Sequence, residues 1–422
     1  MKYIFKNKTD FVKNIIVLIS GTTLAQAIPI LISPILTRVY SPENFGVLGL
    51  FVSMSSFLGV IVSLRYDSAI IQADNDAEAK QLGLVAFTSS LIFSIFLLLI
   101  VLFFNDSISA LFDNKKIGDW LYFLPLTVIS ISLFYILSFW LNRKKRFVEM
   151  SVNKIVNKSS ESFISLFLGV FNFKSIGLLF GYIFGQFITT LLLLNKVRKD
   201  KFRLKPLLAK KVIKKYKEFP IYFLPSTIMS EISSNVSLLL MGSLYGATFT
   251  GFYALVFRVT YLPLGLVGNS IGDVYRQKAY EHYLEFGNCK ELYLKTFKTL
   301  FLIGLAPLIA LLFMGEYLFT FVFGSEWETA GTISKYFSFL IFFQFISTPL
   351  AYTVFLNKSH KFDFILQFLR ALFTIFSLFI GYYYNDFMLG IILMVIVYCV
   401  YYIFNSLLQY NAATGSKYFK TK

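Results

Sequence analysis

The chain has 422 residues, of which 56% are hydrophobic and 15% are charged, and 50 of them are phenylalanine. A soluble protein of this length needs more polar residues to cover its surface, so the composition excludes an ordinary soluble domain. The formal net charge of +17 would suggest a nucleic-acid partner in a soluble protein. Here the basic residues lie in short segments between apolar runs, which indicates a membrane protein and no nucleic-acid partner.

Twelve apolar runs follow one another along the chain. Most are long enough to cross a hydrocarbon layer of ~30 Å as helices, which takes about 20 residues. We therefore predict an all-α, polytopic membrane protein with twelve transmembrane helices. The fifth and ninth runs are the shortest, because they have polar starts. The runs lie near 15–37, 43–64, 82–104, 121–141, 159–173, 175–195, 219–242, 248–272, 299–314, 333–356, 362–384 and 387–408.

Lysine and arginine are unevenly distributed between the two sides of the membrane that these helices define. One side holds 33 of the 40 basic residues and the other holds 5. Basic loops remain in the cytoplasm, so the count predicts that both termini are cytoplasmic. The two remaining basic residues, Arg258 and Arg370, lie within predicted helices.

A strongly basic segment, 196–217, separates an N-terminal six-helix lobe (1–195) from a C-terminal six-helix lobe (218–422). Eleven of its 22 residues are Lys or Arg. From Pro206 onward, apolar residues such as Val212 fall on one helical face and lysines on the other. This pattern predicts either an interfacial amphipathic helix bound to anionic inner-leaflet lipids or only a cytoplasmic orientation signal.

The two lobes resemble each other in sequence at a constant offset of 205 residues. Tyr40 and the segment 46–50 match Tyr245 and the segment 251–255. Both copies fall between the first two helices of a lobe. Because six is an even number, the copies share one orientation, which predicts a parallel pseudo-repeat around a central cavity.

Small and polar residues at three- and four-residue spacing mark one face of the second and eighth helices. Ser53 lies on this face, and the matching positions of the other lobe include Arg258 and Tyr261. Small residues also permit close helix packing, which is the simpler explanation. An arginine facing lipid at mid-depth costs about 2.5–3.5 kcal/mol, however, so Arg258 must face protein or water. We interpret it as a cavity residue, with a structural ion pair as the alternative.

Other polar residues inside the predicted helices extend this set. Gln367 and Arg370 share a face of the eleventh helix, Gln26 lies in the first helix, and Arg38 lies at its end. Glu231, in the seventh helix, could neutralise Arg258 or bind a coupling cation. The other candidate for ion coupling or charge balance is Asp67, which follows the second helix.

Catalytic and metal-binding patterns are absent from the sequence. No glycine-rich phosphate loop, His/Cys cluster or serine-nucleophile motif occurs, and Cys289 and Cys399 fit no metal or redox spacing. We therefore predict a protein that is not an enzyme and has no metal or other cofactor.

The segment 36–46, LTRVYSPENFG, and the following Arg65-Tyr66-Asp67 resemble the N-terminal signature of bacterial polysaccharide (Wzx-type) flippases. These flippases belong to the multidrug/oligosaccharidyl-lipid/polysaccharide superfamily. The resemblance implies two six-helix lobes in the bacterial inner membrane. It also implies an undecaprenyl-pyrophosphate-linked oligosaccharide of O-antigen lipopolysaccharide, capsule or a similar glycan as cargo. Glycan polymerase and chain-length proteins are the implied protein partners.

A pyrophosphate cargo needs a cationic, hydrated cavity, and Arg258 and Arg370 supply fixed positive charge for it. Paired lobes could expose such a site to the two sides of the membrane by alternating access. A multidrug or small-molecule cation antiporter is the first alternative, although such a protein favours acids in its cavity. A polytopic glycan polymerase or ligase is the second, although it would carry a long outward loop with catalytic Arg or His.

Overall fold

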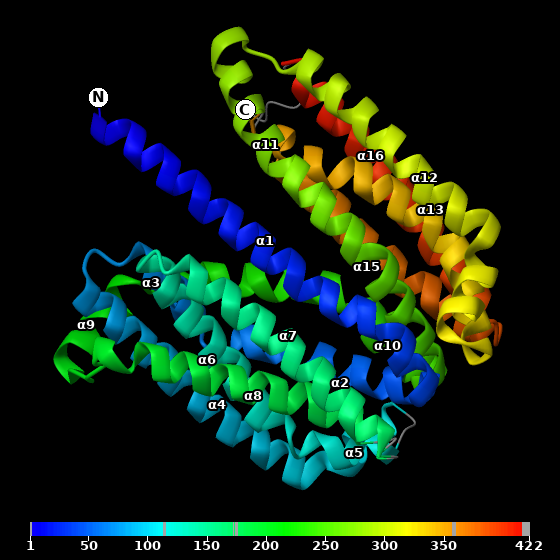
Figure 1. Cartoon of the computed structure of the whole chain (residues 1–422), viewed down its shortest axis with the longest axis horizontal. Helices are drawn as coiled ribbons and strands as arrows, with labels where there is room; N and C mark the ends of the chain where they lie inside the picture. Colours follow the sequence, from blue (N-terminus) through cyan, green and yellow to red (C-terminus); the bar gives the residue numbers. More distant parts are fainter. Residues whose placement is uncertain (1, 113–114, 172, 174–175, 357–359, 416–422) are drawn as a thin grey trace. The chain divides into compact units, whose positions relative to one another are not determined.

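The computed structural model describes residues 2–112, 115–171, 173, 176–356 and 360–415. Every regular element among these residues is a helix (Figure 1). The chain divides into two compact units, Met1–Asn235 and Val236–Lys422, which we call the first lobe and the second lobe. The first lobe thus includes the basic segment 196–217.

The first lobe is built from long antiparallel helices and several short ones. α7 packs along both α1 and α8, and α6 packs against α2 and α4 (Figure 1). The helices are α1 (Lys2–Val39), α2 (Pro42–Ile61), α3 (Tyr66–Gln72), α4 (Asp76–Ala110), α5 (Lys115–Leu121), α6 (Leu124–Arg143), α7 (Phe147–Val170), α8 (Gly177–Val197), the 3₁₀ turn η1 (Arg198–Asp200), α9 (Pro206–Lys215) and the π-helix η2 (Phe219–Phe223).

The second lobe begins within a helix that starts in the first. Its closest helix pairs are α12 with α13 and α15 with α16. The elements are α10 (Leu224–Val256), the π-helix η3 (Phe257–Tyr261), α11 (Leu262–Phe286), α12 (Lys290–Phe323), the 3₁₀ turn η4 (Ser325–Trp327), α13 (Glu328–Leu350), α14 (Tyr352–Leu356), α15 (His360–Tyr383) and α16 (Phe387–Ala413).

Ten stretches of the described chain are long and apolar enough to cross a membrane. One of them, Asn235–Tyr283, contains a break at Gly246, whose φ of 84° is left-handed and separates the predicted seventh and eighth helices. A left-handed φ is readily available to glycine. The predicted fifth helix corresponds to α7, which has too many polar residues to count among the ten. Together these elements give twelve long helices.

Several predicted helix boundaries were wrong: the first helix begins at Lys2 rather than near 15, and the eighth ends at Phe286 rather than near 272. The fifth helix begins at Phe147 rather than near 159, and the ninth runs from Lys290 to Phe323 rather than over 299–314. In both cases the helix continues through polar residues that the apolar pattern excludes. As a result, Lys154 and Lys158 lie inside a helix and not in a loop.

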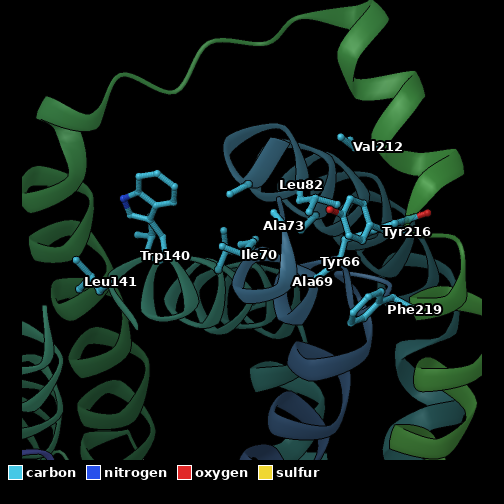
Figure 2. Packing of buried hydrophobic residues seen from close by; sticks show 14 of the residues in the cluster. Tyr66, Ala69, Ile70, Ala73, Leu82, Trp140, Leu141, Val212, Tyr216 and Phe219 are labelled. Atoms are coloured by element: carbon cyan, nitrogen blue, oxygen red, sulfur yellow. The ribbon is translucent and has the colours of Figure 1, made fainter. Parts of the chain in front are cut away.

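The basic segment 196–217 folds onto the first lobe. Val212, Tyr216 and Phe219 join a buried cluster with residues of α3, α4 and α6, among them Tyr66 and Trp140 (Figure 2). Ala209 and Val212 of α9 are therefore covered by protein, whereas Leu207 and Ile213 stay 88% and 43% exposed. Binding of α9 to lipid as an interfacial helix stays a prediction.

Ion pairs hold α9 against the start of α4. The Lys215 ammonium lies 2.6 Å from carboxylate oxygens of both Asp74 and Glu78, and the Tyr216 hydroxyl donates to Glu78 at 3.0 Å. Hydrogen bonds to Asp74 and then Glu78 raise the pKa of Lys215 above its ordinary value of 10.5. Lys215 therefore stays protonated and keeps its two acidic partners.

Candidate functional site

Arg258 lies in η3, a single turn of π-helix between α10 and α11. π-turns widen the helical hydrogen-bond ladder by one residue and occur often at functional sites, because they turn side chains to new directions. Arg258 is half-buried, as is Tyr261 at the end of the same turn. The sequence-predicted pair is therefore placed on one irregular turn of the second lobe.

Arg370, on α15, is held by aromatic rings from α16. Its guanidinium carbon lies 5.2 Å from the ring centre of Tyr398 and 4.7 Å from that of Tyr401. These distances are those of cation–π contacts, which fix the position of the arginine, and its side chain also interacts with that of Tyr402. The Nε atom is buried and has no hydrogen-bond partner among the described residues. Arg370 is thus a positioned cation with spare donor capacity.

Two other predicted residues lie near Arg370. Tyr261 interacts with it electrostatically, which brings η3 and α15 to one site within the second lobe. Gln367 is half-buried and precedes Arg370 by three residues, so the two share a helix face. The structure therefore joins Tyr261, Gln367 and Arg370, with Arg258 three residues before Tyr261.

The glycines that follow Tyr261 divide between two roles. Gly265 has open space where a Cβ would lie, whereas a Cβ at Gly268 would touch Pro349 of α13 at 3.4 Å. Both line a small cavity of about 30 Å³ between α11 and α13, together with Tyr261 and Asn269. The small-residue face therefore borders a cavity at Gly265 and serves helix packing at Gly268.

The predicted residues of the first lobe do not form one cluster. Gln26 is half-buried and Arg38 is exposed, and both lie on α1. Their separation of twelve residues corresponds to about 18 Å along a helix. Ser53 is buried on α2.

The structure brings the predicted acids to a single cation, Arg65. The Asp67 carboxylate accepts a hydrogen bond from the Ser63 hydroxyl at 2.9 Å and lies 3.9 Å from the Arg65 guanidinium. Glu231 interacts electrostatically with Arg65 and accepts a hydrogen bond from Asn235 at 3.0 Å. Arg65 thus pairs with Asp67 at 3.9 Å and acts on Glu231 only through longer-range electrostatics. The sequence did not suggest this partner for Glu231.

Burial changes the chemistry of Asp67. Its side chain is 1% exposed, and this burial raises the pKa of its carboxyl above the ordinary 3.8, although Arg65 and Ser63 act to lower it. Leu64 and Arg65 hold φ values of 52° and 61°, in the left-handed region. Non-glycine residues rarely adopt it. A strained turn therefore presents Arg65 to a carboxyl whose pKa burial raises.

Sequence reasoning placed Lys158 and Glu161 one helical turn apart as a pair, which the structure confirms, but missed Lys154 on the same polar face of α7. The Lys154 ammonium donates to the Thr22 hydroxyl at 3.0 Å, and the Lys158 ammonium lies 2.6 Å from a carboxylate oxygen of Glu161. The apolar run 159–173 would form a helix only about 22 Å long, too short to cross a ~30 Å layer. That shortfall could have indicated that the helix begins earlier and includes both lysines.

Comparisons with known proteins agree with this fold. The model of the family described as "Polysaccharide biosynthesis protein" matches residues 35–332. No curated protein gives a significant match.

Several solved structures are similar to the chain. A lipid II flippase MurJ in an inward closed conformation is 15% identical, with a TM-score of 0.73 over 95% of this chain and 90% of that one. A MATE transporter from Vibrio cholerae is 11% identical, with a TM-score of 0.61 over 95% of each chain. A MOP superfamily transporter from Pyrococcus furiosus is 16% identical, with a TM-score of 0.54 over 94% of each.

These likenesses concern the fold, because every identity is below 25%. The match of the family model covers well over half of the chain and is independent of them. The chain therefore belongs to the polysaccharide biosynthesis protein family and is a multi-pass, all-α membrane protein with the twelve-helix, two-lobed fold of MOP superfamily transporters.

Proposed function

We propose that the protein moves an undecaprenyl-pyrophosphate-linked oligosaccharide across the bacterial inner membrane by alternating access. The observation that carries this proposal is Arg370, a half-buried cation held by Tyr398 and Tyr401, whose buried Nε has no hydrogen-bond partner among the described residues. A guanidinium with free donors suits the oxygens of a pyrophosphate. Membership of a polysaccharide biosynthesis family points to a glycan on that phosphate.

The residues near Arg370 complete a cationic site in this proposal. Arg258 adds a second positive charge, and Tyr261 and Gln367 offer donors and acceptors to phosphate or sugar hydroxyls. Gln26, Arg38 and Ser53 of the first lobe are proposed to contact the cargo at other stages of the cycle.

The acids of the first lobe are proposed to couple transport to an ion or to the membrane potential. Arg65 pairs with Asp67 and also acts electrostatically on Glu231, so protonation of Asp67 would leave more of the positive charge of Arg65 to favour the Glu231 carboxylate. Such an exchange changes the charge near the start of α10, the helix that leads into the second lobe. A proton or a monovalent cation would serve equally well in this role.

The proposal includes a location and partners. Both termini would be cytoplasmic, the cargo would be a repeat unit of O-antigen, capsule or a similar glycan, and a polymerase and chain-length proteins would receive it. A cation antiporter is the alternative function, because a MATE transporter shares the fold. Two arginines at the candidate site weigh against a cationic cargo.

Surface glycan in a strain that lacks the gene tests the proposal. Arg258→Ala or Arg370→Ala should reduce surface glycan strongly at equal levels of membrane-inserted protein. Lys at either position should rescue poorly if a bidentate guanidinium contact is needed. Arg276→Ala, an exposed arginine on α11, is the matched control and should leave glycan unchanged. Normal glycan from an Arg258→Ala, Arg370→Ala double variant would reject the proposal.

A further inference from the structure

A lipid-facing groove lies at one end of the first lobe. It is formed by α4, α6, the end of α8 and Phe202, and has a volume of about 330 Å³. Apart from Arg198, its lining is apolar, with Leu84, Phe87, Leu133, Leu137 and Leu194 among the residues. Leu194 is 41% exposed, so the groove opens outward from the helix bundle.

The groove extends over about one turn of each helix that lines it. Its α4 residues run from Gly83 to Phe87 and its α6 residues from Leu133 to Leu137. One turn spans about 5.4 Å. Because the apolar run of α4 begins near residue 82, this turn lies at the edge of the predicted hydrocarbon layer, where the first part of an acyl chain would pack against it.

Positive charge surrounds the end of the groove that lies at the helix termini. Arg198 lines the groove itself, and Lys199 and Lys201 beside it are exposed. Asp200 is the one acid of the segment 196–217, and its carboxylate already has protein partners. Its carboxylate accepts hydrogen bonds from the Trp140 indole at 2.9 Å and from the Arg146 guanidinium at 3.3 Å.

This basic end is held in place by the protein. Phe202 packs edge-on against Trp140 with ring centres 5.2 Å apart. The Gln81 side chain donates to the Arg203 carbonyl at 2.8 Å and accepts from the Lys205 amide at 3.0 Å. Arg198 therefore stands at a fixed entrance rather than on a mobile tail.

We propose that the groove binds an anionic glycerophospholipid, with one acyl chain between α4 and α6 and the phosphate at Arg198. The apolar lining matches the chain, and the uncompensated basic residues match a net negative headgroup. A zwitterionic phospholipid offers the same chain but carries no net charge for these residues. The inference does not depend on which cargo the protein transports.

Native mass spectrometry of the purified full-length protein tests this assignment. The protein is incubated with equal amounts of phosphatidylglycerol and phosphatidylcholine that carry identical acyl chains. Phosphatidylglycerol should be retained preferentially. Arg198→Gln should reduce its retention about fivefold, the loss expected for one basic residue near anionic headgroups. Lys210→Gln removes the same charge from the exposed face of α9, outside the groove, and should change retention little.

Filling the groove gives a second test. Leu133→Trp should reduce retention of both lipids, whereas Leu126→Trp, two turns away on the same face of α6 and outside the groove, should not. Leu84→Trp fills the groove from α4 and serves if Leu133→Trp does not elute as a single folded species.

Several results would overturn the proposal. Equal retention of the two lipids by the wild type would show that the lipid charge does not contribute to binding. Equal effects of Arg198→Gln and Lys210→Gln would show that Arg198 has no special role. Equal lipid retention by Leu133→Trp and Leu126→Trp would show that the groove is not the lipid-binding site. Displacement of phosphatidylglycerol by an equimolar polyprenyl phosphate would assign the groove to the tail of a cargo lipid instead.

Discussion

Tyr40 and Tyr245 make the same contact in their respective lobes. Each hydroxyl donates to a backbone carbonyl of the fifth long helix of its lobe, Tyr40 to Ser165 in α7 and Tyr245 to Leu378 in α15, both at 2.6 Å. The sequence offset of 205 that relates the tyrosines is therefore matched by an equivalent hydrogen bond. A pseudo-repeat is present in the packing as well as in the chain.

Glycines make room for both tyrosines. A Cβ at Gly177, the first residue of α8, would collide with the Tyr40 hydroxyl, and a Cβ at Gly390, in α16, would lie 2.6 Å from the Tyr245 hydroxyl. Each tyrosine thus reaches the junction of the fifth and sixth long helices of its lobe because a glycine stands there.

Gly390→Ala should destabilise the second lobe, because its methyl group overlaps the Tyr245 hydroxyl. Overpacking of this kind costs about 1–3 kcal/mol. Tyr245→Phe alone loses a hydrogen bond worth about 1 kcal/mol. The double variant should be more stable than Gly390→Ala alone, because the ring carbon that remains lies 3.4 Å from the added Cβ. Thermal unfolding of purified protein measures the three variants against wild type.

Gly381→Ala is the matched control for the comparison of Gly390→Ala with the double variant. A Cβ at Gly381 would lie 2.5 Å from the Tyr245 hydroxyl but also 2.6 Å from the Gly390 Cα, a backbone atom that cannot turn away. Tyr245→Phe should therefore fail to rescue Gly381→Ala. Equal rescue of both alanine variants would contradict the contact geometry.

Lys158→Ala should destabilise the protein more than the double change Lys158→Ala, Glu161→Gln. The single change leaves the Glu161 carboxylate, which is 11% exposed, without its partner at 2.6 Å. We expect a loss of about 1–3 kcal/mol, below the value for a fully buried pair because Lys158 is 35% exposed. Denaturant or thermal unfolding checks the order, and a double variant less stable than the single one would refute it.

Asp67→Asn should alter how stability depends on pH. Burial raises the folded-state pKa of Asp67, so its carboxyl favours the folded state fully below the ordinary value of 3.8 and loses that effect as the pH rises through the raised value. The melting temperature of the wild type minus that of the variant should therefore fall from about pH 4 to about pH 8. A difference that stays constant, or grows, over this range would disprove the assignment.

Cysteine labelling on intact cells should distinguish the two sides of the membrane. Lys205→Cys and Ser325→Cys both place a thiol at an exposed position, in a background where Cys289 and Cys399 are replaced. Because basic loops stay in the cytoplasm, a membrane-impermeant reagent should label position 325 and should reach position 205 only after permeabilisation. The reverse pattern would invert the proposed topology.

The features that the sequence predicted well are those that depend on apolar length and repetition. The break at Gly246 falls between the predicted seventh and eighth helices. Arg370 and Gln367 lie on one face of α15, as their spacing predicts, and their role in a cavity stays a prediction. Each of these follows from helical spacing or from the cost of exposing a cation to lipid.

The features that the sequence did not predict depend on contacts between distant segments. The polar face of α7 packs against α1 and α8, so Lys154 lies within a helix that the apolar pattern cut short. Glu231 interacts electrostatically with Arg65, which lies 166 residues earlier in the chain. No local sequence pattern indicates this interaction. Val212 of α9 packs in a cluster with residues of α3 and α4, where Lys215 meets two acids.

The docking of α9 has a mechanical consequence. With Lys215 and Tyr216 fixed to the first lobe, the basic segment 196–217 acts as part of that lobe and not as a slack tether. The boundary between the compact units falls between Asn235 and Val236, inside α10. A helix resists bending and transmits torque, whereas a loop does neither. The chain therefore passes from the first lobe to the second within a helical segment, with Glu231 one turn before the boundary.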